Sequence, residues 1–361
     1  MSVNQTGPRK FSQIALQERS FLLLIGLGFM IVGFTYQNAS IARWVGFALA
    51  GYSAIANDSI QTIGTFLAAN KKQPWWLLWI FVAGLFIATM TYSFVVHNGD
   101  VTYERLSAKG FDQTPMNFAF LQVASPLFLL ILTRLKIPVS TTFLLLTSFA
   151  TTPSGIGKVV TKSMMGYCLA FGISIGLWLI FAPAIKKWLK KPEGKHWLIL
   201  QWLTSGVLWT VWLMQDASNI AVFLPRKMQL IEFLAFTGTM ALGLGLLMKL
   251  KGDRIQEVVT EKSQVVDLRA ATLINFIYAG ILFYFKMHSK MPMSTTWVFI
   301  GLLSGRELAM ALRHTSNFTL PGALKIVFRD LAYVTFGLLV SVVIAFASNE
   351  VFAEAVKGVF K

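Results

Sequence analysis

The chain has 361 residues, of which 55% are hydrophobic and only 13% are charged. Soluble domains carry about 25% charged residues, so this composition excludes an ordinary water-soluble protein and indicates one that folds in a lipid bilayer. The formal net charge of +16 could suggest a nucleic-acid-binding protein. The Lys and Arg residues, however, stand in short clusters between apolar runs, where they orient membrane helices, so we expect no nucleic-acid partner.

Residues 1–19 are polar and are predicted to form a cytoplasmic N-terminal segment. The apolar run that follows, within 20–40, lacks an A-x-A-type cleavage site and is long enough to cross a bilayer. It is therefore predicted to be a retained transmembrane helix, additional to the rest of the bundle, rather than a signal peptide.

Further apolar runs that could each cross about 30 Å of hydrocarbon as a helix recur along the chain. They lack the alternation of a barrel strand, so the predicted fold class is an all-α polytopic membrane protein. The candidate spans lie near 20–37, 41–56, 75–96, 116–133, 164–185, 196–214, 228–250, 268–285 and 329–347.

Two polar motifs occur twice. Residues 56–61 and 214–219 each pair an amide residue with an Asp and place a second amide three residues later. Residues 138–142 and 292–296 each read Pro-x-Ser-Thr-Thr. The two Asp residues lie 158 positions apart and the two Ser residues 154 apart, so both motifs repeat at nearly one offset. We expect repeat 1 over 41–190, repeat 2 over 191–350 and a C-terminal tail over 351–361.

The basic residues of the short loops indicate how the halves are oriented. If the N-terminus is cytoplasmic, the basic clusters at 71–72 and 134–136 are also cytoplasmic. The cluster at 186–195 lies on the same side of the membrane if the chain around 138–162 crosses the bilayer once in net. The two Asp-bearing segments then run in opposite directions, which predicts an inverted repeat. Lys158 and Lys162 do not fit this count.

The repeated Asp motif predicts a cation site. An ionised Asp in a membrane segment costs about 2.5–3.5 kcal/mol, so one that is retained there usually faces a cavity and binds something. The alternative is a helix cap at the end of a span. Carboxylates and amide oxygens are hard ligands suited to Na⁺ or to a proton relay. The predicted cation-binding residues are Asp58, Asp216, Asn57, Gln61, Gln215 and Asn219.

The repeated Pro-x-Ser-Thr-Thr motif predicts an anion site. A helix that begins after the proline presents free N–H groups, hydroxyls and its positive dipole end to one spot, which suits an oxyanion. Short polar helices are tolerated in a membrane where they line a cavity, which predicts re-entrant hairpins over about 138–156 and 292–307. Taken singly, each motif could be an ordinary N-cap. The predicted anion-binding residues are Ser140, Thr141, Thr142, Ser294, Thr295, Thr296, Asn57 and Asn219.

From about residue 45 to 310 the sequence resembles the inorganic phosphate transporter (PiT) family, including related sulfate permeases. Each half of that family carries a G-A-N-D-x-A-N motif followed by Gly, and a downstream P-V-S-T-T-H. The resemblance implies an inverted-repeat carrier, commonly dimeric, whose Asp and amide residues bind coupling cations and whose Ser-Thr-Thr hairpins hold phosphate.

The sequence departs from the family at several of these positions. Gln61 and Gln215 stand where the family has Asn, and Phe143 and Trp297 stand where it has His. A longer amide shifts a ligand atom by about one bond, which is enough to alter the choice of ion.

The resulting prediction is a secondary transporter that couples Na⁺ or H⁺ to inorganic phosphate, in the bilayer of a bacterial inner membrane and as a homodimer. The alternatives are a permease for sulfate or another small oxyanion, a passive anion channel, and a non-transporting sensor. No nucleotide-binding motif or catalytic constellation stands out, so we expect neither an enzyme nor a cofactor. The single cysteine, Cys168, excludes an intrachain disulfide.

Overall fold

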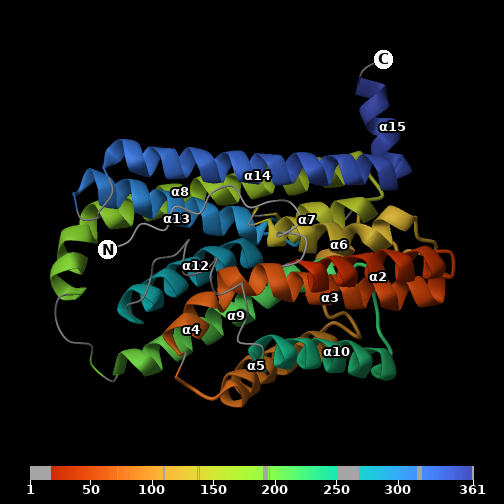
Figure 1. Cartoon of the computed structure of the whole chain (residues 1–361), viewed down its shortest axis with the longest axis horizontal. Helices are drawn as coiled ribbons and strands as arrows, with labels where there is room; N and C mark the ends of the chain where they lie inside the picture. Colours follow the sequence, from red (N-terminus) through yellow and green to blue (C-terminus); the bar gives the residue numbers. More distant parts are fainter. Residues whose placement is uncertain are drawn as a thin grey trace.

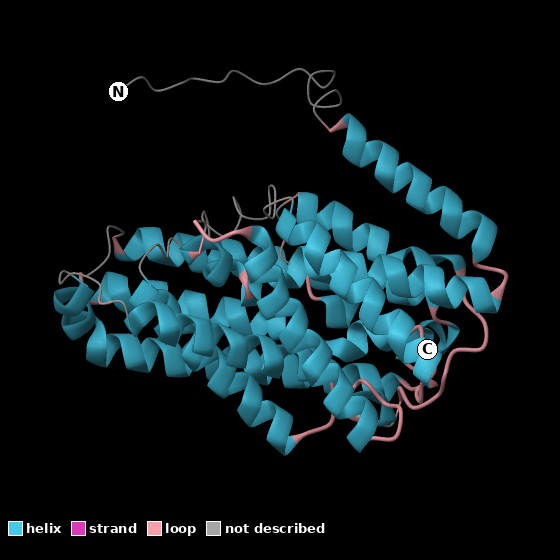
Figure 2. Cartoon of the chain, turned by 90° about the horizontal axis from the view of Figure 1, so that it is seen from below, coloured by secondary structure: helices cyan, strands magenta, loops and turns pink. Residues whose placement is uncertain are grey.

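The computed structural model describes residues 18–70, 72–108, 110–135, 137, 139–189, 194, 196–249, 268–314 and 319–359. Within these ranges every element of regular secondary structure is a helix, and Figure 2 shows helices joined by loops, with no strand in the described part of the chain. The prediction of an all-α protein is confirmed.

Six helices are long and apolar enough to cross a membrane. They are α5 (Trp75–Val96), α8 (Pro153–Leu189), α9 (His196–Ala221), α10 (Leu230–Lys249), α12 (Leu268–His288) and α14 (Leu320–Ser348). Two shorter apolar helices, α2 (Arg19–Thr35) and α6 (Phe120–Arg134), accompany them.

The distribution of side chains is that of a membrane protein. Large apolar residues lie on the outside, where Phe34, Ile231 and Leu242 expose 83%, 71% and 73% of their surface. Polar residues of the repeated motifs, by contrast, are buried. An apolar surface of this extent is stable against lipid but not against water.

The helices form three groups (Figure 1). The first contains α14, α8 and α13 (Thr295–Leu312), and the third contains α5 and α10, which pack against each other. Between them lie α3 (Ala39–Thr62), α9 and α12, with α9 in contact with both of its neighbours. Helix α2 packs on α6 and α3. The middle group carries both Asp motifs, which places them inside the bundle.

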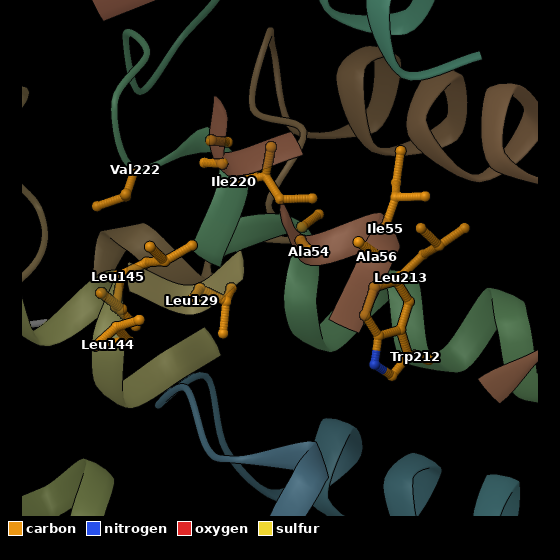
Figure 3. Packing of buried hydrophobic residues seen from close by; sticks show 14 of the residues in the cluster. Ala54, Ile55, Ala56, Leu129, Leu144, Leu145, Trp212, Leu213, Ile220 and Val222 are labelled. Atoms are coloured by element: carbon orange, nitrogen blue, oxygen red, sulfur yellow. The ribbon is translucent and has the colours of Figure 1, made fainter. Parts of the chain in front are cut away.

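Apolar side chains surround this middle group. The described buried residues form one hydrophobic cluster to which α3, α6 and α9 all contribute. Figure 3 shows part of the cluster, including Ala54, Ile55, Ala56, Leu129, Leu144, Leu145, Trp212, Leu213, Ile220 and Val222. The polar motifs therefore sit within a packed apolar shell.

Some predicted boundaries were wrong. Helix α3 continues to Thr62 rather than ending near residue 56, and α8 begins at Pro153 rather than near 164. An estimate from apolar runs stops where polar residues begin. The helical backbone does not have to stop there, because these polar side chains find partners inside the bundle.

The two segments that were predicted as hairpins differ from each other in the structure. In the first half, the short helix α7 (Thr141–Leu144) and the 3₁₀ turn η2 (Leu146–Phe149) precede α8, so this segment is interrupted. In the second half, α13 runs unbroken from Thr295 to Leu312, and the hairpin predicted over 292–307 has no turn. The region expected as a C-terminal tail includes helix α15 (Glu350–Val359).

Helices α8 and α13 approach each other closely at two glycines spaced as in G-x-x-x-G. A Cβ on Gly301 would lie 2.5 Å from the carbonyl oxygen of Tyr167, and one on Gly305 would lie 2.5 Å from that of Phe171. These neighbours are backbone atoms, so they cannot move aside as a flexible side chain can. Small residues are what allow membrane helices to pack this tightly.

We expect Gly301→Ala to lower the thermal stability of the detergent-solubilised protein by several degrees, because overpacking costs about 1–3 kcal/mol. Thermal unfolding monitored by tryptophan fluorescence would measure this. Gly172→Ala on α8 is the matched control, since a Cβ there has no neighbour within 4 Å and Ala favours the helix. Equal stability of the two variants would contradict the close-packing assignment.

Candidate functional site

Both Asp residues of the repeated motif lie near the C-terminal end of a helix and are buried. Asp58 lies in α3, which ends at Thr62, and Asp216 lies in α9, which ends at Ala221. Their side chains are 0% and 1% exposed. A carboxylate caps the N-terminus of a helix favourably but is disfavoured near the negative C-terminal end. The helix-cap alternative is therefore wrong, and these charges need another source of stabilisation.

The chain breaks its helix after each motif. In the first half, Ile63 separates α3 from the short helix α4 (Gly64–Ala69), and in the second half α9 gives way to a non-helical stretch that contains Pro225. The two carboxyl groups interact electrostatically across α3 and α9. Two carboxyl groups that influence each other inside the bundle can supply negative charge and oxygen ligands to a positive ion.

Asn57 ties the first Asp to the chain that leads into the first Ser-Thr-Thr motif. Its Nδ2 donates to Asp58 Oδ1 at 2.7 Å and to the Val139 carbonyl at 2.9 Å. Its Oδ1 accepts a hydrogen bond from Thr133 Oγ1 at 3.1 Å. The amide is held from both ends and so has a fixed orientation.

Each half donates an amide to the hydroxyls of the other half. Asn219 Nδ2 donates to Thr141 Oγ1 at 3.0 Å and to Thr142 Oγ1 at 3.1 Å, and also to Asp216 Oδ1. In return, Gln61 Nε2 donates to Thr296 Oγ1 at 3.2 Å. The predicted cation and anion residues are thus brought together, and they are brought together crosswise.

The two Ser-Thr-Thr motifs also meet directly, because Thr142 Oγ1 donates to the Met293 carbonyl at 3.1 Å. Ser140 and Ser294 act as N-caps: they accept the backbone N–H groups of Phe143 and Trp297, each at 3.2 Å. The N-cap alternative is confirmed for both Ser hydroxyls. Within these two motifs, the hydroxyls that form hydrogen bonds with the other half are those of Thr141, Thr142 and Thr296.

Several oxygens of the Asp and amide residues have no hydrogen-bond partner among the described residues, although they are buried. A buried acceptor left in this way costs about 1–3 kcal/mol, and such atoms are rare in folded proteins. Carboxylate and amide oxygens are the ligands that a hard cation such as Na⁺ prefers, so these atoms have the chemistry of a cation site. The atoms are Oδ2 of Asp58, Oδ2 of Asp216, Oε1 of Gln61, Oε1 of Gln215 and Oδ1 of Asn219.

The two residues that replace the family's His contact each other. The rings of Phe143 and Trp297 are buried and meet edge to face, with centroids 5.5 Å apart. Tyr167 also contacts Trp297 edge to face, with ring centroids 6.4 Å apart. An aromatic pair thus joins the first turns of α7 and α13, which makes the two replacements a matched set.

Sequence reasoning missed a chain of buried polar residues beyond the first motif. Thr65 Oγ1 donates to Asn275 Oδ1 at 3.0 Å, and Asn275 Nδ2 donates to Ser205 Oγ at 2.9 Å. Gln201 Nε2 also donates to Ser205, at 3.1 Å, and Asn70 Nδ2 donates to Gln201 Oε1 at 3.0 Å. The available signal was an amide residue inside each of two apolar runs, at 201 and 275.

These helices and their buried polar centre define an all-α polytopic membrane protein. The structure is similar to a solved structure described as "The sodium-dependent phosphate transporter", with a TM-score of 0.54 over 86% of this chain and 98% of that chain, at 17% sequence identity. At this identity the likeness shows the fold alone. No family model matches the sequence, and no curated protein matches it.

Proposed function

We propose that the protein is a secondary transporter that couples the entry of Na⁺ to that of inorganic phosphate. The observation that carries this proposal is the set of hydrogen bonds between the amides of one half and the hydroxyls of the other. Asn219 donates to Thr141 and Thr142, and Gln61 donates to Thr296. The likeness to a sodium-dependent phosphate transporter supports the same assignment.

The cation binds at the carboxylates. Asp58 and Asp216 supply two negative charges, and the buried oxygens of Gln61, Gln215 and Asn219 supply neutral ligands. Binding neutralises carboxylates that repel each other and that lie at the unfavourable ends of α3 and α9. Na⁺ can therefore bind before phosphate does.

Cation binding prepares the anion position through the shared amide. Asn219 Nδ2 donates both to Asp216 Oδ1 and to the hydroxyls of Thr141 and Thr142. When a cation binds to Asp216, the amide of Asn219 is released from the carboxylate. The N–H groups of Asn219 and the hydroxyls of Thr141 and Thr142 can then donate to an oxyanion. The negative charge of phosphate then gains from the nearby cation, so each ligand favours the other.

Sulfate is the second candidate, because threonine hydroxyls and helix N-termini accept any tetrahedral oxyanion. Uptake of radiolabelled phosphate into proteoliposomes, with unlabelled sulfate as competitor, separates the two. Concentrative uptake driven by an inward Na⁺ gradient is expected, and it should disappear in choline. Uptake that only equilibrates would indicate a passive channel, and uptake driven by a pH gradient alone would make H⁺ the coupling ion.

We also propose that repeats 41–190 and 191–350 are inverted, that the N-terminus is cytoplasmic in a bacterial inner membrane, and that the protein forms a homodimer. The crosswise pairing supports a pseudo-symmetric arrangement of the halves. Labelling of single cysteines in the 97–115 and 251–266 connections, from each side of the membrane, tests the orientation. Mass measurement in detergent tests the dimer.

A further inference from the structure

Arg105 is a buried cation that has no role in the proposed coupling of Na⁺ and phosphate. It begins the 3₁₀ turn η1 (Arg105–Ser107) in the connection between α5 and α6, and its side chain is 0% exposed. Its Nε donates to the Met214 carbonyl at 2.8 Å and its Nη1 to the Met291 carbonyl at 3.2 Å. Its Nη2 is buried with no hydrogen-bond partner among the described residues.

The guanidinium remains charged despite its burial. Burial lowers the pKa of Arg105 to about 10, and the negative charge of Asp216 opposes this effect. At neutral pH the group is therefore protonated, and one of its nitrogens has donor capacity left over.

A second cation converges on the same place. Lys162 of α8 is partly buried, and its Nζ donates to the Met291 carbonyl at 2.7 Å. Two nitrogens bonded to one oxygen can be no farther apart than the sum of the two bond lengths, so Lys162 and Arg105 repel each other at short range. Lys162 and Lys158 are the two residues that did not fit the count of basic residues in the loops, and of these two Lys158 is exposed.

The nearby acids do not pair with these two cations. Glu104 forms an ion pair with Lys290 at 2.5 Å, and Asp216 attracts Arg105 without a hydrogen bond to it in the described part of the chain. Lys286 adds a further positive charge that acts on Arg105. The surroundings of Met291 therefore carry an excess of positive charge, which an anion would compensate.

We propose that Arg105 and Lys162 bind a tetrahedral oxyanion beside Met291, at a position that precedes the threonine hydroxyls. Nη2 of Arg105 and Nζ of Lys162 would donate to different oxygens of the anion, as charge-assisted hydrogen bonds. Met291 lies three residues before Ser294, the N-cap of α13, whose positive dipole end adds to the attraction. This inference rests on the proposed function in taking the transported oxyanion as the ligand: the anion is held here before it passes to the hydroxyls.

The test uses purified full-length protein and measures equilibrium phosphate binding together with initial uptake rates in proteoliposomes. Lys162→Gln removes one charged donor and Arg105→Gln removes the other. Arg105→Lys keeps the positive charge but loses the planar set of donors of the guanidinium group. Lys158→Gln is the matched control, because Lys158 is exposed one turn earlier on the same helix. Thermal unfolding of each variant shows whether it remains folded.

We expect Lys162→Gln and Arg105→Gln each to weaken phosphate binding and to raise KM about tenfold, the effect of one charge-assisted hydrogen bond. The maximal rate and the Na⁺ half-saturation should stay within about threefold of wild type. Arg105→Lys should lie between Arg105→Gln and wild type, and Lys158→Gln should match wild type.

An unchanged phosphate affinity in Lys162→Gln overturns the anion position, and this variant decides the question if Arg105→Gln fails to fold. A lower maximal rate with unchanged phosphate affinity in Arg105→Gln would mean that Arg105 only holds the Met291 segment in place. That result would also overturn the anion position. If wild type shows no phosphate uptake, the proposed function fails. Equilibrium binding of phosphate and sulfate still judges the anion position, which is overturned if wild type binds neither.

Discussion

Asp216→Asn is expected to reduce Na⁺-driven phosphate uptake at least about 100-fold, which corresponds to about 3 kcal/mol of lost interaction. The substitution keeps the size of the side chain but removes the charge that would hold the cation. Asp58→Asn should have the same effect, because both carboxylates are buried and act on each other. The loss of uptake is expected in a protein that remains folded. Uptake assays in proteoliposomes are therefore paired with thermal unfolding of each variant.

Asp330→Asn is the control for this prediction. Asp330 is also an Asp in a membrane helix, α14, but it lies outside the repeated motifs and pairs with Arg329 at 3.6 Å. Its replacement should change uptake less than about threefold. Full activity in Asp58→Asn and Asp216→Asn would contradict the assignment of the coupling site.

Thr141→Val and Thr296→Val are each expected to raise the KM for phosphate about tenfold, because each removes one hydroxyl while keeping the side-chain shape. These hydroxyls accept the amides of Asn219 and Gln61, and they become anion donors once those amides turn. The half-saturation for Na⁺ should change less than the KM for phosphate. Initial uptake rates over a range of both substrates would separate the two parameters.

Thr335→Val serves as the control for the threonines, since its hydroxyl donates to the Leu331 carbonyl of its own helix. Ser140→Ala and Ser294→Ala should act differently, by removing N-caps and lowering stability by about 1 kcal/mol each. If the serine variants raised KM and the threonine variants did not, the anion would lie at the serine hydroxyls instead.

The sequence was sufficient to predict the fold class and the two polar motifs that the structure buries in the bundle. Long apolar runs predicted membrane helices, and the doubled motifs predicted that Asp58 and Asp216 would come together. Boundaries were predicted less well, because an estimate from apolar runs ends this span near residue 56 although α3 continues to Thr62. The unbroken course of α13 was missed for a related reason: a polar N-terminal turn does not reveal whether the helix later reverses.

The pairing within the site could not be predicted from the sequence. Spacing shows that motifs repeat, but it does not show that Asn219 contacts Thr141 rather than the threonines of its own half. Arg105 was missed because it lies in a polar connection, where arginine is ordinarily solvated; its burial arises from the way the connection packs onto Met214 and Met291. These facts depend on tertiary contacts between distant segments.

The most direct test of a joint cation and anion site is equilibrium binding of phosphate to the purified protein in NaCl and in choline chloride. With a joint site, Na⁺ increases phosphate affinity about tenfold or more, and phosphate increases Na⁺ affinity by the same factor, since coupling between two bound ligands is reciprocal. Equal phosphate affinity in the two salts would contradict it.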